Sequence, residues 1–96
     1  MKENKIKYEQ DFDELHIIFC DEVDNPRIQI LDNSVMIEFD DNDNISTIVF
    51  PNFSKMLGRP INSYESFSLS NTTFEDDAIV ITLDWSGPPI NVKLSI

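Results

Sequence analysis

The feature of this sequence that most constrains its fold is a two-residue alternation of apolar and polar side chains, which recurs in several short segments. It is clearest in residues 34–50, where the alternation runs from Val35 to Phe39 and a run rich in β-branched residues follows at 45–50. This period places every second side chain on the same face of a β-strand. The intervening residues 40–44 are all Asp or Asn, which favour turns. Residues 34–50 are therefore predicted to form a β-hairpin.

The same reasoning predicts further strands on both sides of this hairpin. Residues 78–85 are apolar on both faces as far as Leu83, which indicates a central strand. Residues 90–96 alternate strictly, which indicates a strand with one buried face and one wet face. The other predicted strands are residues 5–8, 14–19, 27–31 and 65–69, and the predicted loops and turns are residues 20–26, 70–77 and 86–89.

A short helix is predicted near residues 52–57, where the alternation stops. Pro51 cannot donate a hydrogen bond to a strand ladder, and the apolar residues from Phe53 to Leu57 have helical spacing. Gly58 suits the left-handed position that ends a helix. We therefore expect one or two helical turns that end at this glycine.

Together these elements predict a mainly β protein with about seven or eight strands and one short helix. Its strands are expected to form a single antiparallel β-sheet, a sandwich or a partly closed barrel. The length of 96 residues suits one domain with a modest core. Residues 1–96 are therefore predicted to form a single domain.

The charge of the chain is strongly and unevenly negative. Eighteen Asp and Glu residues face seven Lys and Arg residues, which gives −11 at pH 7. Residues 1–45 hold thirteen of the acidic residues and four of the basic ones, so they carry −9 of that total. Such a charge repels nucleic acid and anionic membranes and attracts a basic protein. It also keeps a protein soluble, and the sequence leaves both interpretations open.

Few residues of the chain offer catalytic or metal-binding chemistry. Residues 40–44 open like a calcium-binding EF-hand loop, but Ile45 stands where that loop needs Gly, and Pro51 where it needs Glu. His16 and Cys20 lie four residues apart, which is roughly 13 Å along an extended strand. The sequence therefore predicts no enzyme activity, no cofactor and no metal site.

The protein is expected in the cytoplasm. Cys20 is the single cysteine, so no disulfide can form within the chain, and a reducing compartment is the simplest interpretation. Residues 1–14 are too polar for a signal peptide. No apolar run approaches the roughly 18 residues of a membrane span.

Five aromatic side chains are not all assigned to the core by the alternation. Each could cap the end of a small β core, or it could anchor a partner, since aromatic residues dominate the energetics of many interfaces. These residues are Phe12, Phe53, Tyr64, Phe74 and Trp85.

Four strand motifs follow one another within residues 5–57. Residues 6–9, 13–17, 34–40 and 47–54 are IKYE, DELHI, SVMIEFD and TIVFPNFS. This succession resembles a small, widespread bacterial family of uncharacterised function. Members of that family show I-x-Y-D, D-A-L-Y-I, G-V-I-x-D-Y-D-x-x-G and G-I-E-I-L-x-A-S. The chain departs from this pattern at Glu9, His16, Ser34 and Asn44.

The resemblance implies a β-meander followed by a short helix, with residues 58–96 outside the family pattern. Members of the family often lie beside genes for small toxin-like proteins. The resemblance therefore implies an antitoxin-like role.

The favoured hypothesis is a protein-binding inhibitor of the antitoxin, immunity or phage anti-defence type. Its acidic loops would cover a cationic surface and mimic phosphates, so the expected partner is a basic nuclease or nucleic-acid-binding protein. The alternative is a structural or oligomerising β module that forms a homodimer through an exposed edge such as residues 90–96. The predicted partner-binding residues are Asp11, Asp13, Asp21, Glu22, Asp24, Asp40, Asp41 and Asp43.

Overall fold

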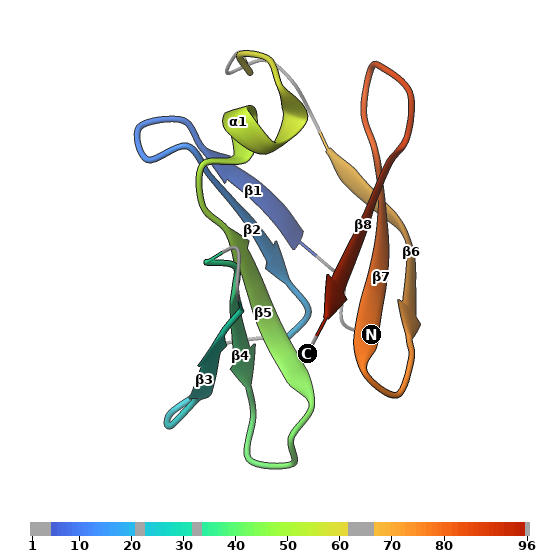
Figure 1. Ribbon diagram of the computed structural model, residues 1–96. Helices are drawn as coiled ribbons and strands as arrows, with labels where there is room; N and C mark the ends of the chain where they lie inside the picture. The colour runs from blue at the N-terminus through green and yellow to red at the C-terminus, as the bar shows by residue number, and fades with distance from the viewer. Residues whose placement is uncertain (1–4, 21–22, 32–33, 62–66, 96) are drawn as a thin grey trace. The chain divides into compact units, whose positions relative to one another are not determined.

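The chain forms two compact units, Met1–Ser63 and Tyr64–Ile96, and each contains one antiparallel sheet (Figure 1). The prediction of a mainly β protein with seven or eight strands and one short helix is confirmed. The strands form two open sheets, one of five strands and one of three. That residues 1–96 form a single domain stays a prediction. The computed structural model describes residues 5–20, 23–31, 34–61 and 67–95.

The helix and strands follow the predicted order along the chain. The first unit contains β1 (Lys5–Glu9), β2 (Glu14–Ile18), β3 (Arg27–Ile30), β4 (Met36–Phe39), β5 (Ile45–Phe50) and α1 (Phe53–Leu57). The second unit contains β6 (Ser68–Phe74), β7 (Ala78–Asp84) and β8 (Ile90–Ser95).

The most apolar strand of the first unit, β5, lies in the middle of its sheet. The strand order is β1-β2-β5-β4-β3, and Ile48, Val49 and Phe50 of β5 are all buried. A strand with neighbours on both sides exposes the least surface, so the central place suits the most apolar sequence. The order differs from the meander that the family resemblance implies, because β5 pairs with β2 as well as with β4.

The core of the five-stranded sheet lies on one of its faces. Ile17, Ile48 and Ile37 pair in one row across β2, β5 and β4, and all three are fully buried. Leu15 and Phe50 form the next row and are fully buried as well. Complete burial of such a side chain contributes about 1.5–3 kcal/mol relative to exposure. These two rows therefore hold the sheet together.

The short helix α1 ends where the sequence predicts. The N–H of Gly58 donates to the carbonyls of Ser54 (2.9 Å) and Lys55 (3.1 Å), and this glycine has the left-handed φ of 77°. Phe53 is the buried residue of the helix. Among the residues that the structure describes, no helix has the length and apolar character needed to cross a membrane.

Replacing Gly58 with alanine is expected to lower the free energy of unfolding by about 1 kcal/mol. A Cβ atom at this position would have no neighbour within 4 Å, so the loss comes from the left-handed backbone alone. Urea unfolding followed by circular dichroism measures it. Gly58→Asn is the control, since asparagine tolerates this conformation better. Equal stability of the alanine variant and the wild type would contradict this argument.

The sheet of the second unit has one apolar and one polar face. β7 lies between β6 and β8, which confirms its predicted central position. Ile79, Ile81 and Leu83 of β7 are buried on one face. On the other face, the Thr82 hydroxyl donates to the Asn91 side chain across the β7–β8 pair (2.8 Å).

The prediction of a loop over residues 70–77 is wrong, because β6 continues to Phe74. The pairing of β6 with β7 shifts its register between Leu69 and Asn71, so Ser70 is an extra residue in the ladder. This β-bulge interrupts the two-residue alternation of side chains along β6. Because the alternation stops at the bulge, a period of two cannot detect the second half of the strand.

Candidate functional site

Two acidic segments lie at the same end of the five-stranded sheet. β2 and β4 are both antiparallel to β5, so both end where β5 begins. Residues 19–20 and 23–26 of the β2–β3 connection and the β4–β5 turn (residues 40–44) therefore lie at this end (Figure 1). We call the described carboxylates there the acidic end; they are Asp24, Asp40, Asp41 and Asp43.

The other four predicted partner-binding residues do not belong to the acidic end. Asp21 and Glu22 lie outside the described residues. Asp11 and Asp13 lie in the β1–β2 turn, at the opposite end of the sheet, near α1 (Figure 1). The structure thus brings together four of the predicted carboxylates and separates two others from them.

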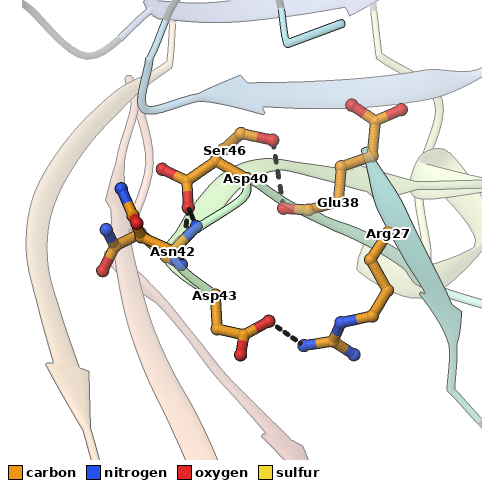
Figure 2. A network of polar contacts seen from close by, with 7 residues as sticks. Arg27, Glu38, Asp40, Asn42, Asp43 and Ser46 are labelled. Carbon is orange, nitrogen blue, oxygen red and sulfur yellow. Dashed lines mark hydrogen bonds and ion pairs between the residues drawn. The ribbon is translucent and has the colours of Figure 1, made fainter. Parts of the chain in front are cut away.

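Asp40 holds the β4–β5 turn in shape. Its Oδ1 atom accepts hydrogen bonds from the backbone N–H groups of Asn42 (2.8 Å) and Asn44 (2.9 Å), as Figure 2 shows. The backbone N–H of Asp43 donates to the Asp40 carbonyl (3.0 Å), and Asp43 has a left-handed φ of 62°. The predicted hairpin turn is confirmed, and its side chains satisfy its own backbone as turn-forming residues do.

One cation, Arg27, lies within the acidic end. Its guanidinium donates to Oδ1 of Asp43 at 3.1 Å (Figure 2). It also lies 4.1 Å from the centre of the Phe39 ring. Both members of the ion pair are exposed, so the pair contributes little to stability. Asp24 and Asp41 are exposed and pair with no cation among the described residues. These two carboxylates are the ones most available to a partner.

A β-bulge at Ser46 joins the acidic end to β2. The β4–β5 register shifts between Glu38 and Phe39, which leaves Ser46 as the extra residue. The carbonyl of Ser46 accepts the backbone N–H of Phe19 (2.8 Å), and its hydroxyl donates to the Glu38 carbonyl (3.1 Å; Figure 2). Bulges bend a strand and redirect its side chains. This one fixes the end of β2 against the start of β5.

Beside the bulge, the face of the sheet opposite the core has a shallow depression of about 490 Å³. Glu38, Thr47 and Ile18 form one row across this face. The Glu38 carboxylate makes no ion pair within the described chain, and in Figure 2 it points away from the β4–β5 turn. The depression is lined by His16, Ile18, Cys20, Val23, Pro26, Glu38, Ser46 and Thr47.

The depression combines apolar side chains (Ile18, Val23 and Pro26) with polar ones and one carboxylate. A lysine or arginine, which has an apolar stem and a charged head, suits such an environment. The alternation does not single out Glu38 as a site residue. The sequence nevertheless contains a feature that could have drawn attention to Glu38, since it is the one charged residue of an otherwise apolar strand.

The carboxylate of Asp13, at the opposite end of the sheet, accepts hydrogen bonds from residues of its own unit. Its Oδ1 accepts hydrogen bonds from the Tyr8 hydroxyl (2.6 Å) and the Ser54 N–H (2.9 Å), and its Oδ2 accepts one from the Ser54 hydroxyl (2.6 Å). The Asp13 carbonyl accepts the N–H of Phe53 (2.9 Å). Asp13 therefore caps α1 from a turn far away in sequence, because Asn52 at the helix start makes no side-chain cap.

The environment of Asp13 stabilises its charged form. Burial raises the pKa of this carboxyl, but the hydrogen bonds from Ser54 and Tyr8, together with the nearby charge of Lys55, outweigh that effect. The net pKa of Asp13 therefore lies below the ordinary value of an aspartate. Its two oxygens are engaged inside the fold, which gives Asp13 a structural role.

The side chains of His16 and Cys20 line the same depression, but His16 is engaged with its own strand. Its Nε2 atom lies 3.2 Å from Oε1 of Glu14. Cys20 is a half-buried free thiol. Within the described part of the chain, no three His, Cys, Asp or Glu side chains come together as metal ligands would.

The five unassigned aromatic residues have different environments. Phe53 is fully buried, and its ring centre lies 6.2 Å from those of Tyr8 and Phe50. Trp85 stacks on Phe67 at 6.1 Å. Phe12 and Phe74 are 73% and 63% exposed, and Tyr64 lies outside the described residues.

Comparisons of this chain with protein-family models, with curated proteins and with solved structures gave no significant match. The resemblance of residues 5–57 to the bacterial family therefore stays a prediction.

Proposed function

We propose that this protein is an acidic inhibitor that binds a basic surface on a nuclease or on another nucleic-acid-binding protein. The observation that carries the proposal is the gathering of Asp24, Asp40, Asp41 and Asp43 at one end of the five-stranded sheet. Closely spaced carboxylates on a fixed framework can take the places of nucleic-acid phosphates on a cationic surface.

The geometry suggests how the two surfaces would meet. The acidic end attracts the partner over a distance, which speeds association at low salt. The depression beside it would then receive a lysine or arginine, with the aliphatic stem against Ile18 and the charged head at Glu38. By this mechanism the protein occupies the groove that nucleic acid would otherwise enter.

Reversing the charge of Asp24 and Asp41 together, as Asp24→Lys with Asp41→Lys, is expected to slow association with the partner about tenfold or more. Neither residue supports the fold, whereas Asp40 holds its turn and Asp43 pairs with Arg27. The partner is first captured from host lysate at low salt and identified by mass spectrometry. Association rates and inhibition of its nucleic-acid binding are then measured with the purified pair.

The matched control is Asp76→Lys with Asp77→Lys, which changes the charge equally in an exposed turn of the second unit. This control is expected to bind and inhibit nearly as the wild type does. In about 0.5 M salt, where charges are screened beyond roughly 4 Å, the wild type is expected to lose most of its affinity. Equal losses in the two double variants, or binding that salt does not weaken, would contradict the proposal. Self-association without a partner would favour the oligomerising β module.

A further inference from the structure

The edge strands of the two sheets differ in how well they are protected against pairing. β1, β3, β6 and β8 are the edges, and natural edge strands are protected by lysines, bulges or polar side chains. β1 exposes Lys5 and Lys7, the second in an ion pair with Glu9 (2.9 Å). β8 exposes Lys93, and β6 is interrupted by its bulge at Ser70.

β3 carries the most exposed large apolar side chains of the four edges. Ile28 and Ile30 are 50% and 69% exposed, and they are two of the five exposed large apolar side chains among the described residues. They pair with Glu38 and Met36 on β4, so they stand on the face that holds the depression. The one charged residue of β3, Arg27, is engaged with Asp43 and Phe39.

We propose that β3 binds an extended strand of the basic partner, which would become the sixth strand of the five-stranded sheet. This inference rests on the proposed function and specifies how the partner docks. Backbone hydrogen bonds along the edge of β3 would supply affinity, as in other cases of strand addition. The exposed Ile28 and Ile30 select aliphatic side chains at alternate positions of the added strand.

Charge favours a basic partner strand over a second copy of this chain. Glu38 lies opposite Ile28 on β4, and the acidic end lies beside the start of β3, where Arg27 pairs with Phe39. Each chain carries −11, so two copies that met through β3 would repel each other. A strand with aliphatic residues opposite Ile28 and Ile30, and with lysines or arginines at the end beside the acidic end, complements both the charge and the two isoleucines.

A short synthetic peptide with valines at alternate positions and a run of lysines at one end is the probe. Nuclear magnetic resonance of the full chain is expected to show saturable shifts centred on residues 27–30, with slower amide hydrogen exchange there. Ile30→Lys is expected to weaken binding about tenfold, as loss of an interface anchor does. Ser68→Lys adds the same charge at an exposed position on the β6 edge and is the control. The same peptide with glutamates in place of the lysines should not bind.

Three results would overturn strand addition at β3. They are the absence of peptide shifts, shifts of equal size on β1 or β8, and equal binding by Ile30→Lys and Ser68→Lys. A further result would overturn it: sedimentation shows that the wild type is a dimer and that Ile30→Lys is a monomer. The strand added to β3 would then come from a second copy of this chain. With the captured partner, loss of binding in the Asp24 and Asp41 variant but not in Ile30→Lys would refute strand addition and leave the proposed function standing.

Discussion

Replacing Asp13 with alanine is expected to lower the free energy of unfolding of the five-stranded unit by about 3 kcal/mol. The variant removes the carboxylate that caps α1 through Ser54 and accepts the Tyr8 hydroxyl. It also places alanine at a left-handed φ of 54°. Urea unfolding measures the loss, and amide hydrogen exchange at Phe53 and Ser54 should report the release of the helix start directly.

Two variants separate the causes of this loss. Asp13→Asn keeps a side chain that tolerates the left-handed backbone, so it is expected to lose only about 1 kcal/mol. Asp11→Ala changes an exposed carboxylate in the same turn and is expected to stay within about 0.5 kcal/mol of the wild type. If Asp11→Ala destabilised the protein as much as Asp13→Ala, the capping role would be refuted.

The stability due to the Asp13 charge is expected to depend on pH in a defined direction. The folded-state pKa of Asp13 is lowered, so the unfolded chain binds the proton more readily. This contribution is therefore fully present above about pH 4, the ordinary pKa of an aspartate, and is lost as pH falls through the folded-state pKa. The advantage of the wild type over Asp13→Asn should shrink below about pH 4. An advantage that grew there would contradict the assignment.

Replacing Phe53 with alanine is expected to have a comparable or larger effect, with a loss of about 3–5 kcal/mol in the free energy of unfolding. Phe53 is fully buried and contacts the rings of Tyr8 and Phe50. It is also the buried residue of α1, so its loss leaves a cavity and removes the contact that holds the helix to the sheet.

The exposed Phe12 provides the control for this prediction. Phe12→Ala is expected to change the free energy of unfolding by less than about 0.5 kcal/mol, because that ring is 73% exposed. A double variant of Asp13 and Phe53 should lose less than the sum of the two single losses, since both residues hold α1 in place. Full additivity would show that the cap and the ring act independently.

Alternation of side chains predicts most of this fold because the sheet has one buried face in the first unit. Val35, Ile37 and Phe39 are all buried, as their spacing predicts. Gly58 and the polar run at 40–44 likewise have local signals, since the residues themselves favour those backbone conformations. Such features require no knowledge of distant parts of the chain.

The alternation fails where the ladder itself is irregular. Ser70 adds a residue to β6, so the strand continues after the period is broken. Whether a strand tolerates such an insertion depends on its partner, β7, and the segment alone does not contain that information.

The charge, the strand pattern and the short helix follow from the sequence, because they depend on composition and on neighbouring residues. Which carboxylates lie at the same end of the sheet depends on the tertiary structure. Asp13 and Asp40 both lie in polar turns, yet Asp13 caps a helix that begins 40 residues later in the chain, whereas Asp40 belongs to the acidic end. The reason is the pairing of β5 with β2, a contact between distant segments. It places one turn beside α1 and the other beside residues 23–26.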